Sequence, residues 1–322
     1  MATLTWSRYR KSLAGDIVRL WNRALGEQFP LSIRLFRQNV EEGPSYDPED
    51  GAVVMNGDEV VGYALTERFR AKDPLQETYK TTGWLEAVVV DPAYQRQGVG
   101  CSLLDWATAR LHSQGAAKIL VGGGRHRFFP GVPAELPGVQ DYFSRAGFRV
   151  SQTVYDVRGN LRHFAAPPSA RAALAAVGGD VRPCRTEDIP ALMDFLQAEF
   201  PGGWRFDTRF FLDQGYDPAE VIIMTQGAHV IGFAHIWSWR SRFLGPSVYW
   251  KKLLGHRCGG LGPIGVAQGM RGKGLGLALL QLALQYDAEL GVEDGIIDWT
   301  TLTGFYALAG FTPWKTYIRM EC

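Results

Sequence analysis

The sequence has little cysteine and no long apolar run. Four cysteines occur in 322 residues, and they form neither CxxC pairs nor a Cys/His ligand spacing. No window approaches the ~18 apolar residues of a membrane-spanning helix, and residues 1–20 lack the uninterrupted apolar core of a signal peptide. We therefore expect a cytoplasmic protein with reduced thiols, no metal site and no membrane partner. The cysteines are Cys101, Cys184, Cys258 and Cys322.

The chain also lacks an excess of charge of either sign. It has 34 basic and 33 acidic residues, whereas binding to nucleic acid or to an anionic membrane favours a strong basic excess or a basic stripe. Neither partner is expected. The hydrophobic content of 46% is that of an ordinary soluble globular protein, and 322 residues suit two cores of ~100–200 residues each.

Internal repetition is the strongest positive feature of the sequence. Three pairs of segments recur in the same order, and the offsets between their matching glycines are nearly constant at 170 (232−62), 176 (274−98) and 163 (310−147) residues. We interpret this as a duplicated domain, with an Ala/Pro-rich join. The expected boundaries are 1–165 for the first domain, 166–180 for the linker and 181–322 for the second domain. The paired segments are 59–65 and 229–235, 95–100 and 271–276, and 142–148 and 305–311.

Both copies show the same order of expected elements. A β-hairpin precedes a strand, a glycine-rich turn, a helix, another strand, a short helix and a last strand. This order predicts an α/β fold in which each copy is a mixed sheet packed by helices. In the second copy we expect a first strand at 181–185, the two hairpin strands at 221–224 and 230–233, and a strand that ends near 266. The helix is expected at 275–290, the next strand at 295–298 and the last strand at 315–319. In the first copy, 85–90 and 117–121 flank the corresponding helix.

The glycine turns have the composition of a pyrophosphate site. A strand that runs into Q/R-x-x-G-x-G and then into a helix exposes backbone N–H groups at the positive end of a helix dipole. Glycine permits the tight turn and the close approach of the ligand. The basic side chains of Arg96, Arg271 and Lys273 can offset phosphate charge. One such turn is weak evidence. Two copies with matching flanking segments favour a pyrophosphate site over a pair of ordinary tight turns.

Two other nucleotide-binding motifs fail on the residues that they require. A P-loop needs GxxxxGK[ST], which the segment 269–274 does not supply. A dinucleotide fingerprint needs a third glycine, where this chain has Leu103 and Leu279. An NAD-dependent oxidoreductase therefore stays a minor alternative.

With these paired motifs the chain resembles the GNAT superfamily of N-acetyltransferases. Segments 90–100 and 266–276 are similar to that family's fourth strand and pyrophosphate loop, and Gly147-Phe148 and Gly310-Phe311 to its closing element. The tandem layout is similar to that of double-domain members such as mycothiol synthase, although no motif fixes that substrate. The resemblance implies two GNAT-like domains that bind acetyl-CoA or another acyl-CoA in a gap between two strands. The implied cofactor-binding residues are Val88, Val89, Val90, Gln95, Arg96, Gln97, Gly98, Val99, Gly100, Ile264, Gly265, Val266, Arg271, Gly272, Lys273, Gly274, Leu275 and Gly276.

The implied activity is transfer of an acyl group to the primary amine of a small molecule, by direct attack on the thioester. The amine must lose a proton before it attacks, and the departing thiolate benefits from gaining one. Glu86, four residues before Val90, stands where similar acetyltransferases often carry a base. A solvated residue at a strand edge is the alternative interpretation. The equivalent residue of the second copy is Gly262.

Tyr306 stands four residues before Gly310, at the family's usual position for a general acid. A packing residue whose hydroxyl reaches water is the alternative. The first copy has Phe143 there, with Tyr142 out of phase. The two copies therefore divide the catalytic equipment. We favour the second copy as the catalytic one, within a monomer that is an internal pseudo-dimer or within a homodimer. A CoA-binding regulatory module without turnover is the competing class of function.

Three segments are candidates for the acceptor site. Residues 236–243 and 249–251 combine aromatic and cationic side chains that suit an amine or a sugar, although core packing is the stronger alternative. The glycine-rich segment 122–131 suits a substrate loop, and His126 within it is a candidate base or a surface residue.

Overall fold

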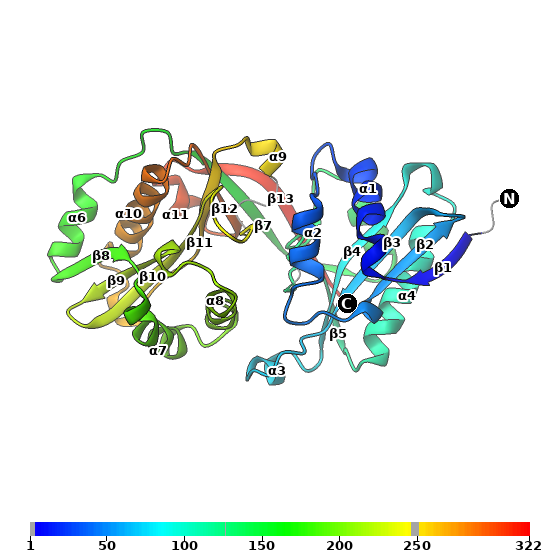
Figure 1. The fold of residues 1–322 in the computed structure, drawn as a ribbon, viewed down its shortest axis with the longest axis horizontal. Helices are drawn as coiled ribbons and strands as arrows, with labels where there is room; N and C mark the ends of the chain where they lie inside the picture. The colour runs from blue at the N-terminus through cyan, green and yellow to red at the C-terminus, as the bar shows by residue number, and fades with distance from the viewer. Residues whose placement is uncertain (1–3, 126, 246–250) are drawn as a thin grey trace. The chain divides into compact units, whose positions relative to one another are not determined.

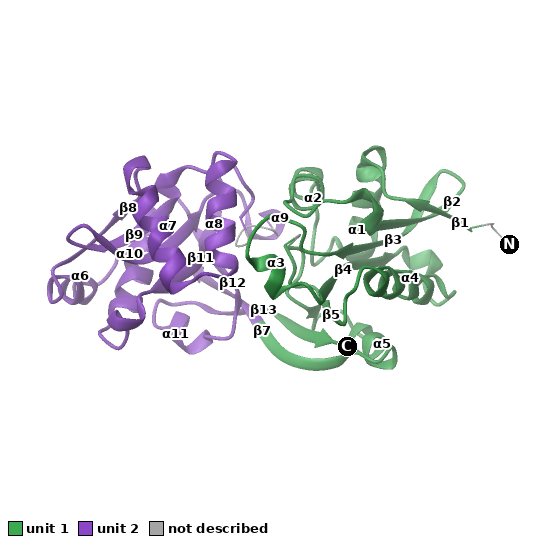
Figure 2. Ribbon diagram, turned by 90° about the horizontal axis from the view of Figure 1, so that it is seen from below, with its two compact units in different colours: residues 1–154, 315–322 green, residues 155–314 purple. Residues whose placement is uncertain are grey.

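The computed structural model describes residues 4–125, 127–245 and 251–322, which form two compact units. Figure 2 shows unit 1, residues 1–154 and 315–322, in green and unit 2, residues 155–314, in purple. Within the described residues, no helix is long and apolar enough to cross a membrane.

Unit 1 is a mixed sheet covered by helices on both faces (Figure 1). The strand order is β1-β2-β3-β4-β5-β13, and β6 pairs with β13. On β3, Ala64 packs with Val99 and Leu103 of α4, while the neighbouring Tyr63 ring contacts Phe36 of α2. Successive strand residues point to opposite faces, so α4 and α2 cover opposite sides of this sheet. The elements are β1 (Leu4–Arg8), α1 (Ala14–Leu25), α2 (Ile33–Val40), β2 (Gly51–Asn56), β3 (Glu59–Glu67), α3 (Leu75–Thr78), β4 (Thr82–Val90), α4 (Val99–Ser113), β5 (Lys118–Val121), β6 (Val132–Pro133) and α5 (Val139–Arg145), with part of β13 (Thr312–Glu321).

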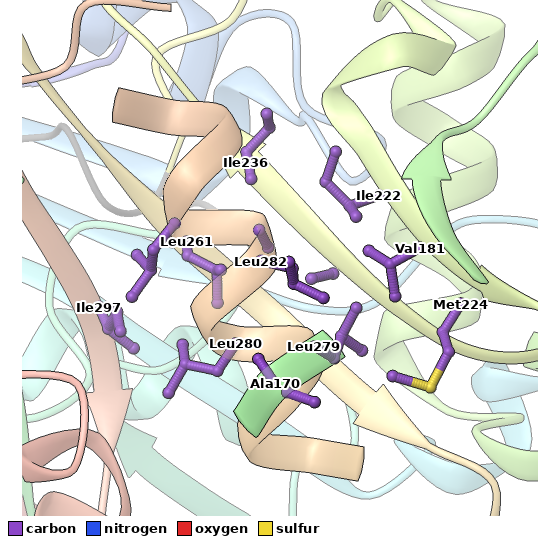
Figure 3. Close-up of a cluster of buried hydrophobic side chains, with 14 of the residues drawn as sticks. Ala170, Val181, Ile222, Met224, Ile236, Leu261, Leu279, Leu280, Leu282 and Ile297 are labelled. Atoms are coloured by element: carbon purple, nitrogen blue, oxygen red, sulfur yellow. The ribbon is translucent and has the colours of Figure 1, made fainter. Parts of the chain in front are cut away.

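Unit 2 repeats this plan with the strand order β8-β9-β10-β11-β12-β7. Its helix α10 is apolar on nearly every side, because it is buried between the sheet and α6. Figure 3 shows Leu279, Leu280 and Leu282 of α10 among side chains of the strands and of α6. The elements are α6 (Pro168–Ala175), β8 (Gly179–Pro183), α7 (Ile189–Glu199), α8 (Gly203–Asp213), β9 (Val221–Gln226), β10 (His229–Trp237), α9 (Lys251–Leu254), β11 (Cys258–Val266), α10 (Leu275–Glu289), β12 (Asp294–Thr300) and α11 (Thr303–Ala307), with part of β7 (Arg149–Asn160).

The predicted fold class is confirmed, and so are both hairpins and the helix after each glycine turn. The compact units, however, differ from the expected domains at their ends. Residues 155–160 of β7 pair with β12 in unit 2, and residues 320–321 of β13 pair with β5 in unit 1. Each unit is therefore completed by a strand segment that the expected boundaries place in the other domain.

In each unit the two central parallel strands are paired only over their first residues. The pairing between β4 and β5 runs from Thr82↔Lys118 to Leu85↔Val121, and that between β11 and β12 from Cys258↔Asp294 to Gly260↔Ile296. Beyond these positions the described residues form no further pairs across the two strands. The strands diverge there, and each gap ends at a glycine turn.

Candidate functional site

The two glycine turns have matching local structures. Gly98 precedes α4 with φ of 86°, and Gly274 precedes α10 with φ of 76°. Both angles lie in the left-handed region that favours glycine. A Cβ at either position would meet no other atom within 4 Å, so the backbone is open on that side. Each helix has 15 residues, and the first amides of a helix lack intrahelical partners. Each turn therefore presents N–H donors and a positive helix end to an anion.

Side chains fix both turns to the strands that precede them. Gln95 Nε2 donates to the carbonyl of Val90 at 3.1 Å, and Arg271 Nε donates to the carbonyl of Val266 at 3.2 Å. These are equivalent bonds between the first residue of each turn and the last residue of its strand. Gln97 Nε2 donates to the carbonyl of Ala93 at 2.9 Å and further fixes the first turn. The repeated motif thus encodes a rigid loop as well as exposed amides.

A groove in unit 1 begins at the glycine turn. It has a volume of about 510 Å³ and is continuous, through shared lining residues, with a smaller cavity of about 160 Å³ that reaches Glu86. The expected cofactor residues that line one or both are Val88, Val89, Val90, Gln95, Arg96, Gly98 and Gly100. The groove thus connects the turn to the interior of the gap between β4 and β5. These residues are the ones in unit 1 that could hold a coenzyme.

Glu86 lies in a bulge of β4 and is almost fully buried, with 2% of its surface exposed. The interpretation as a solvated residue at a strand edge is therefore wrong. The backbone N–H of Gly124 donates to Oε1 at 2.9 Å. Burial, with a further contribution from the charge of Glu67, raises the pKa of the Glu86 carboxyl well above its usual value, against the lowering effects of Gly124, Arg125 and Phe128.

Glu67 was not expected at the site. It lies at the end of β3 and is buried beside Glu86: a Cβ on Gly124 would lie 2.3 Å from Glu86 Oε1 and 2.6 Å from Glu67 Oε2. The two carboxyl groups therefore face the same glycine.

Tyr306 on α11 has only 6% of its surface exposed. Burial, followed by the charge of Asp298, raises its pKa to about 12, although a hydrogen bond with the Thr300 side chain acts in the opposite direction. The hydroxyl thus stays protonated at neutral pH and can donate a proton or a hydrogen bond. In unit 1, Phe143 is buried at the corresponding place, as the sequence indicates.

Asp298 is the other residue that the sequence did not single out. It follows the paired part of β12 and lies across the gap from Gly262 of β11. A Cβ built on Gly262 would lie 3.4 Å from Asp298 Oδ1. Unit 2 therefore has a carboxylate near Gly262, the residue that is equivalent to Glu86 in the sequence of the second copy.

The expected acceptor segments are packed more closely than their composition suggests. Trp237 is fully buried and donates from Nε1 to the carbonyl of Gly262 at 2.7 Å, so this aromatic residue is part of the core. In the 122–131 segment, the Phe129 ring stacks on Trp21 with 5.6 Å between centroids. The candidates His126, Tyr249 and Trp250 lie outside the described residues.

Trp239 lies within reach of two potential polar partners. Its ring centroid is 5.2 Å from that of His256, and the Arg240 guanidinium lies 4.5 Å above it.

Among the residues that the structure describes, no group of three or more His, Cys, Asp or Glu side chains is arranged to hold a metal ion.

Comparison with known proteins identifies relatives of both halves. The family model described as Acetyltransferase (GNAT) family matches residues 16–128 and 189–311. No curated protein sequence matches significantly. Among solved structures, a glucosamine N-acetyltransferase region of a fungal multi-domain GH3 β-N-acetylglucosaminidase is similar over 100% of this chain, with a TM-score of 0.90 and 26% identity. This chain spans 38% of that protein.

Two further structures share the tandem fold. A GCN5-related N-acetyltransferase from Sphaerobacter thermophilus has a TM-score of 0.71 and 17% identity, covering 99% of this chain and 95% of that one. A tandem GNAT protein from the clavulanic acid biosynthesis pathway has a TM-score of 0.66 and 17% identity, covering 99% and 98%. At these identities the likeness concerns the fold.

Proposed function

Because this chain belongs to the GNAT family of acetyltransferases, we propose that it transfers an acetyl group from acetyl-CoA to the primary amine of a small molecule. The observation that carries the proposal is the pair of rigid glycine turns at Gly98 and Gly274, each followed by a 15-residue helix at the end of a diverging strand pair. Open backbone amides at such a helix start suit the diphosphate of coenzyme A. The other loop residues, Arg96, Arg271 and Lys273, add positive charge.

Within this proposal, unit 2 carries out the reaction. The amine loses a proton and attacks the thioester carbonyl, a C–N bond forms, the C–S bond breaks and the thiolate of CoA is protonated. Tyr306 is the proton donor to the thiolate. Its burial supports this role, because burial favours the protonated form of the hydroxyl. Alignment of the two substrates in one gap contributes as well, since effective molarity is worth up to ~7–11 kcal/mol.

An amino sugar is the acceptor that we infer first. The support is the likeness, along the entire chain, to a region described as a glucosamine N-acetyltransferase. The near balance of 34 basic and 33 acidic residues also gives a strongly charged macromolecular substrate little to bind. We therefore choose glucosamine as the reference amine.

Unit 1 supports a second candidate role. Its groove and glycine turn resemble a coenzyme site, yet Phe143 replaces the tyrosine and Glu86 has a raised pKa that favours the neutral acid. A unit that binds CoA without turning it over would fit these features. In the limiting case neither unit turns over, and the chain is a CoA-binding regulatory module.

One assay separates these functions. The full-length chain is incubated with acetyl-CoA and glucosamine, and then with a panel of other amines, while release of free thiol is recorded. We expect thiol release that depends on the amine. Binding of acetyl-CoA in calorimetry with no thiol release from any amine would instead favour the regulatory module, and NAD binding in a fluorescence titration would favour an oxidoreductase.

A further inference from the structure

Each unit places a carboxylate in its own gap between parallel strands, but the two carboxylates come from opposite strands of the pair. The register of both parallel pairs is offset by 36 residues, from Thr82 to Lys118 in unit 1 and from Cys258 to Asp294 in unit 2. Extending each register by the same number brings Glu86 opposite Gly122 and Gly262 opposite Asp298. Unit 1 therefore has its acid on the first strand and glycine on the second, whereas unit 2 has the reverse.

Local backbone geometry directs both carboxylates. Glu86 lies in a β4 bulge, between the pairs Leu65↔Ala87 and Thr66↔Leu85. Asp298 lies in a β12 irregularity, between the pairs Ile297↔Val157 and Thr300↔Tyr155. Bulges in strands re-aim side chains and are frequent next to active sites.

The β12 bulge is held by a buried partner. The backbone N–H of Trp299, whose φ is 51°, donates to Asp156 Oδ1 at 3.1 Å. Asp156 itself is buried on β7. A non-glycine residue in this strained conformation requires support from its surroundings, and such positions cluster at functional sites. The bulge that orients Asp298 is thus a fixed feature of unit 2.

From this geometry we propose that Asp298 accepts the proton of the acceptor amine in unit 2, in place of the carboxylate that Gly262 does not provide. Its Oδ1 lies 3.4 Å from the position of a Cβ on Gly262, inside the gap between the strands. Asp298 is two residues before Thr300 on β12, whose side chain forms a hydrogen bond with Tyr306. A proton acceptor and a proton donor for one transfer reaction would then lie in one unit. This inference rests on the proposed acetyl transfer.

The protons balance in the proposed step. The ammonium group of the acceptor gives one proton to Asp298, and the neutral amine attacks the thioester carbonyl. When the C–S bond breaks, the thiolate takes the proton of the Tyr306 hydroxyl, and the nitrogen of the new amide returns a proton to the tyrosine. Asp298 then releases its proton to solvent. No oxidant or metal is involved.

The test compares Asp298→Asn with the full-length protein in acetyl transfer to glucosamine. General base catalysis contributes about 10²–10⁴-fold, so we expect kcat/KM to fall by about 10²-fold or more with unchanged acetyl-CoA affinity in calorimetry. Asp294→Asn is the matched control, because it makes the same change at the other end of β12, outside the gap. It should keep the turnover of the unchanged protein.

A second acceptor separates proton removal from a structural role. An aminooxy compound is uncharged at neutral pH and has no ammonium proton to lose, so its acetylation should fall by less than about tenfold in Asp298→Asn. An equal loss with both acceptors would overturn the inference. Asp298→Glu retains a carboxylate and should turn over faster than Asp298→Asn. This variant keeps the test valid if Asp298→Asn folds poorly. Turnover of Asp298→Glu no faster than that of Asp298→Asn would count against the inference.

The remaining outcomes are distinct. Full turnover in Asp298→Asn, together with loss of turnover in Glu86→Gln, would overturn the inference and move the chemistry to unit 1 while leaving the acetyl transfer intact. An absence of thiol release from the unchanged protein with every amine would instead remove the proposed function, and the role of Asp298 with it.

Discussion

The hydroxyl of Tyr142 donates a hydrogen bond to the carbonyl oxygen of Gly100 at 2.7 Å, which joins α5 to the first turn of α4 in unit 1. This tyrosine therefore serves the glycine turn rather than the interior of the gap. In unit 2 the residue that matches Tyr142 is Phe305, and the hydroxyl belongs instead to the next residue, Tyr306, which forms a hydrogen bond with the Thr300 side chain. The difference supports the proposal that the proton donor lies in unit 2.

Replacing Tyr306 by Phe should lower turnover by about 10²-fold, because the thiolate loses its proton donor. The affinity for acetyl-CoA should change little, since the proposed site of the diphosphate is the glycine turn. Steady-state kinetics with glucosamine and calorimetry with acetyl-CoA measure the two effects. The control is Tyr286→Phe, which removes a hydroxyl from α10 that faces the carbonyl of Val181. Unchanged turnover in Tyr306→Phe would move the chemistry to unit 1.

The second prediction concerns the positive φ angles of the turns. Valine is strained at φ of 76°, so Gly274→Val should distort the second turn and abolish coenzyme binding in unit 2. Gly98→Val should do the same in unit 1, where φ is 86°. We expect loss of turnover only in Gly274→Val. Calorimetric stoichiometry and thiol release distinguish the two.

The control for both turn variants is Gly269→Val, because this glycine lies in the same loop region without a positive φ, and a side chain there would meet open space. It should bind coenzyme normally. If Gly274→Val also bound acetyl-CoA at both sites, the turns would not be the diphosphate sites.

Much of this arrangement is readable from the sequence because it depends on local chemistry. The glycines at 98 and 274 are needed for the turn itself, and the hairpins follow from alternating apolar residues around short polar turns. Glu86 and Tyr306 keep fixed distances from those motifs, so their places in the fold follow from the resemblance. Local patterns and repetition were sufficient for these elements.

The missed residues depend on pairing between distant segments. Asp298 lies opposite Gly262 only because β11 and β12 pair in parallel across α10, and one sequence does not state the register of such a pair. The signal was present: both copies have the same spacing of 36 residues between a carboxylate and a glycine. The exchange of strand ends between the units is likewise a matter of tertiary pairing, which alternation within β7 cannot reveal.

The third prediction follows from the raised pKa of Glu86. The folded state holds the carboxyl proton more tightly than the unfolded chain. Glu86 therefore makes its full contribution to the free energy of unfolding below the unfolded pKa of about 4.3. It is lost as the pH rises through the folded pKa. Glu86→Gln should therefore flatten the fall in melting temperature between acidic and neutral pH. Thermal unfolding at several pH values measures this, with Asp294→Asn as a control, and equal slopes for Glu86→Gln and the unchanged protein would contradict it.

The last prediction tests the core that positions the second turn. Leu279 of α10 is fully buried, and its Cδ2 lies 3.3 Å from the position of a Cβ on Gly232 of β10. Leu279→Ala would leave a cavity between helix and sheet and should lower the free energy of unfolding by about 2–5 kcal/mol. Leu308→Ala removes the same atoms from a side chain that is 63% exposed and should cost far less. Denaturant unfolding of both variants gives the two values. Because α10 begins directly after Gly274, the loosened helix should also weaken acetyl-CoA binding in unit 2. Equal stability losses in the two variants would mean that this contact does not hold the helix against the sheet.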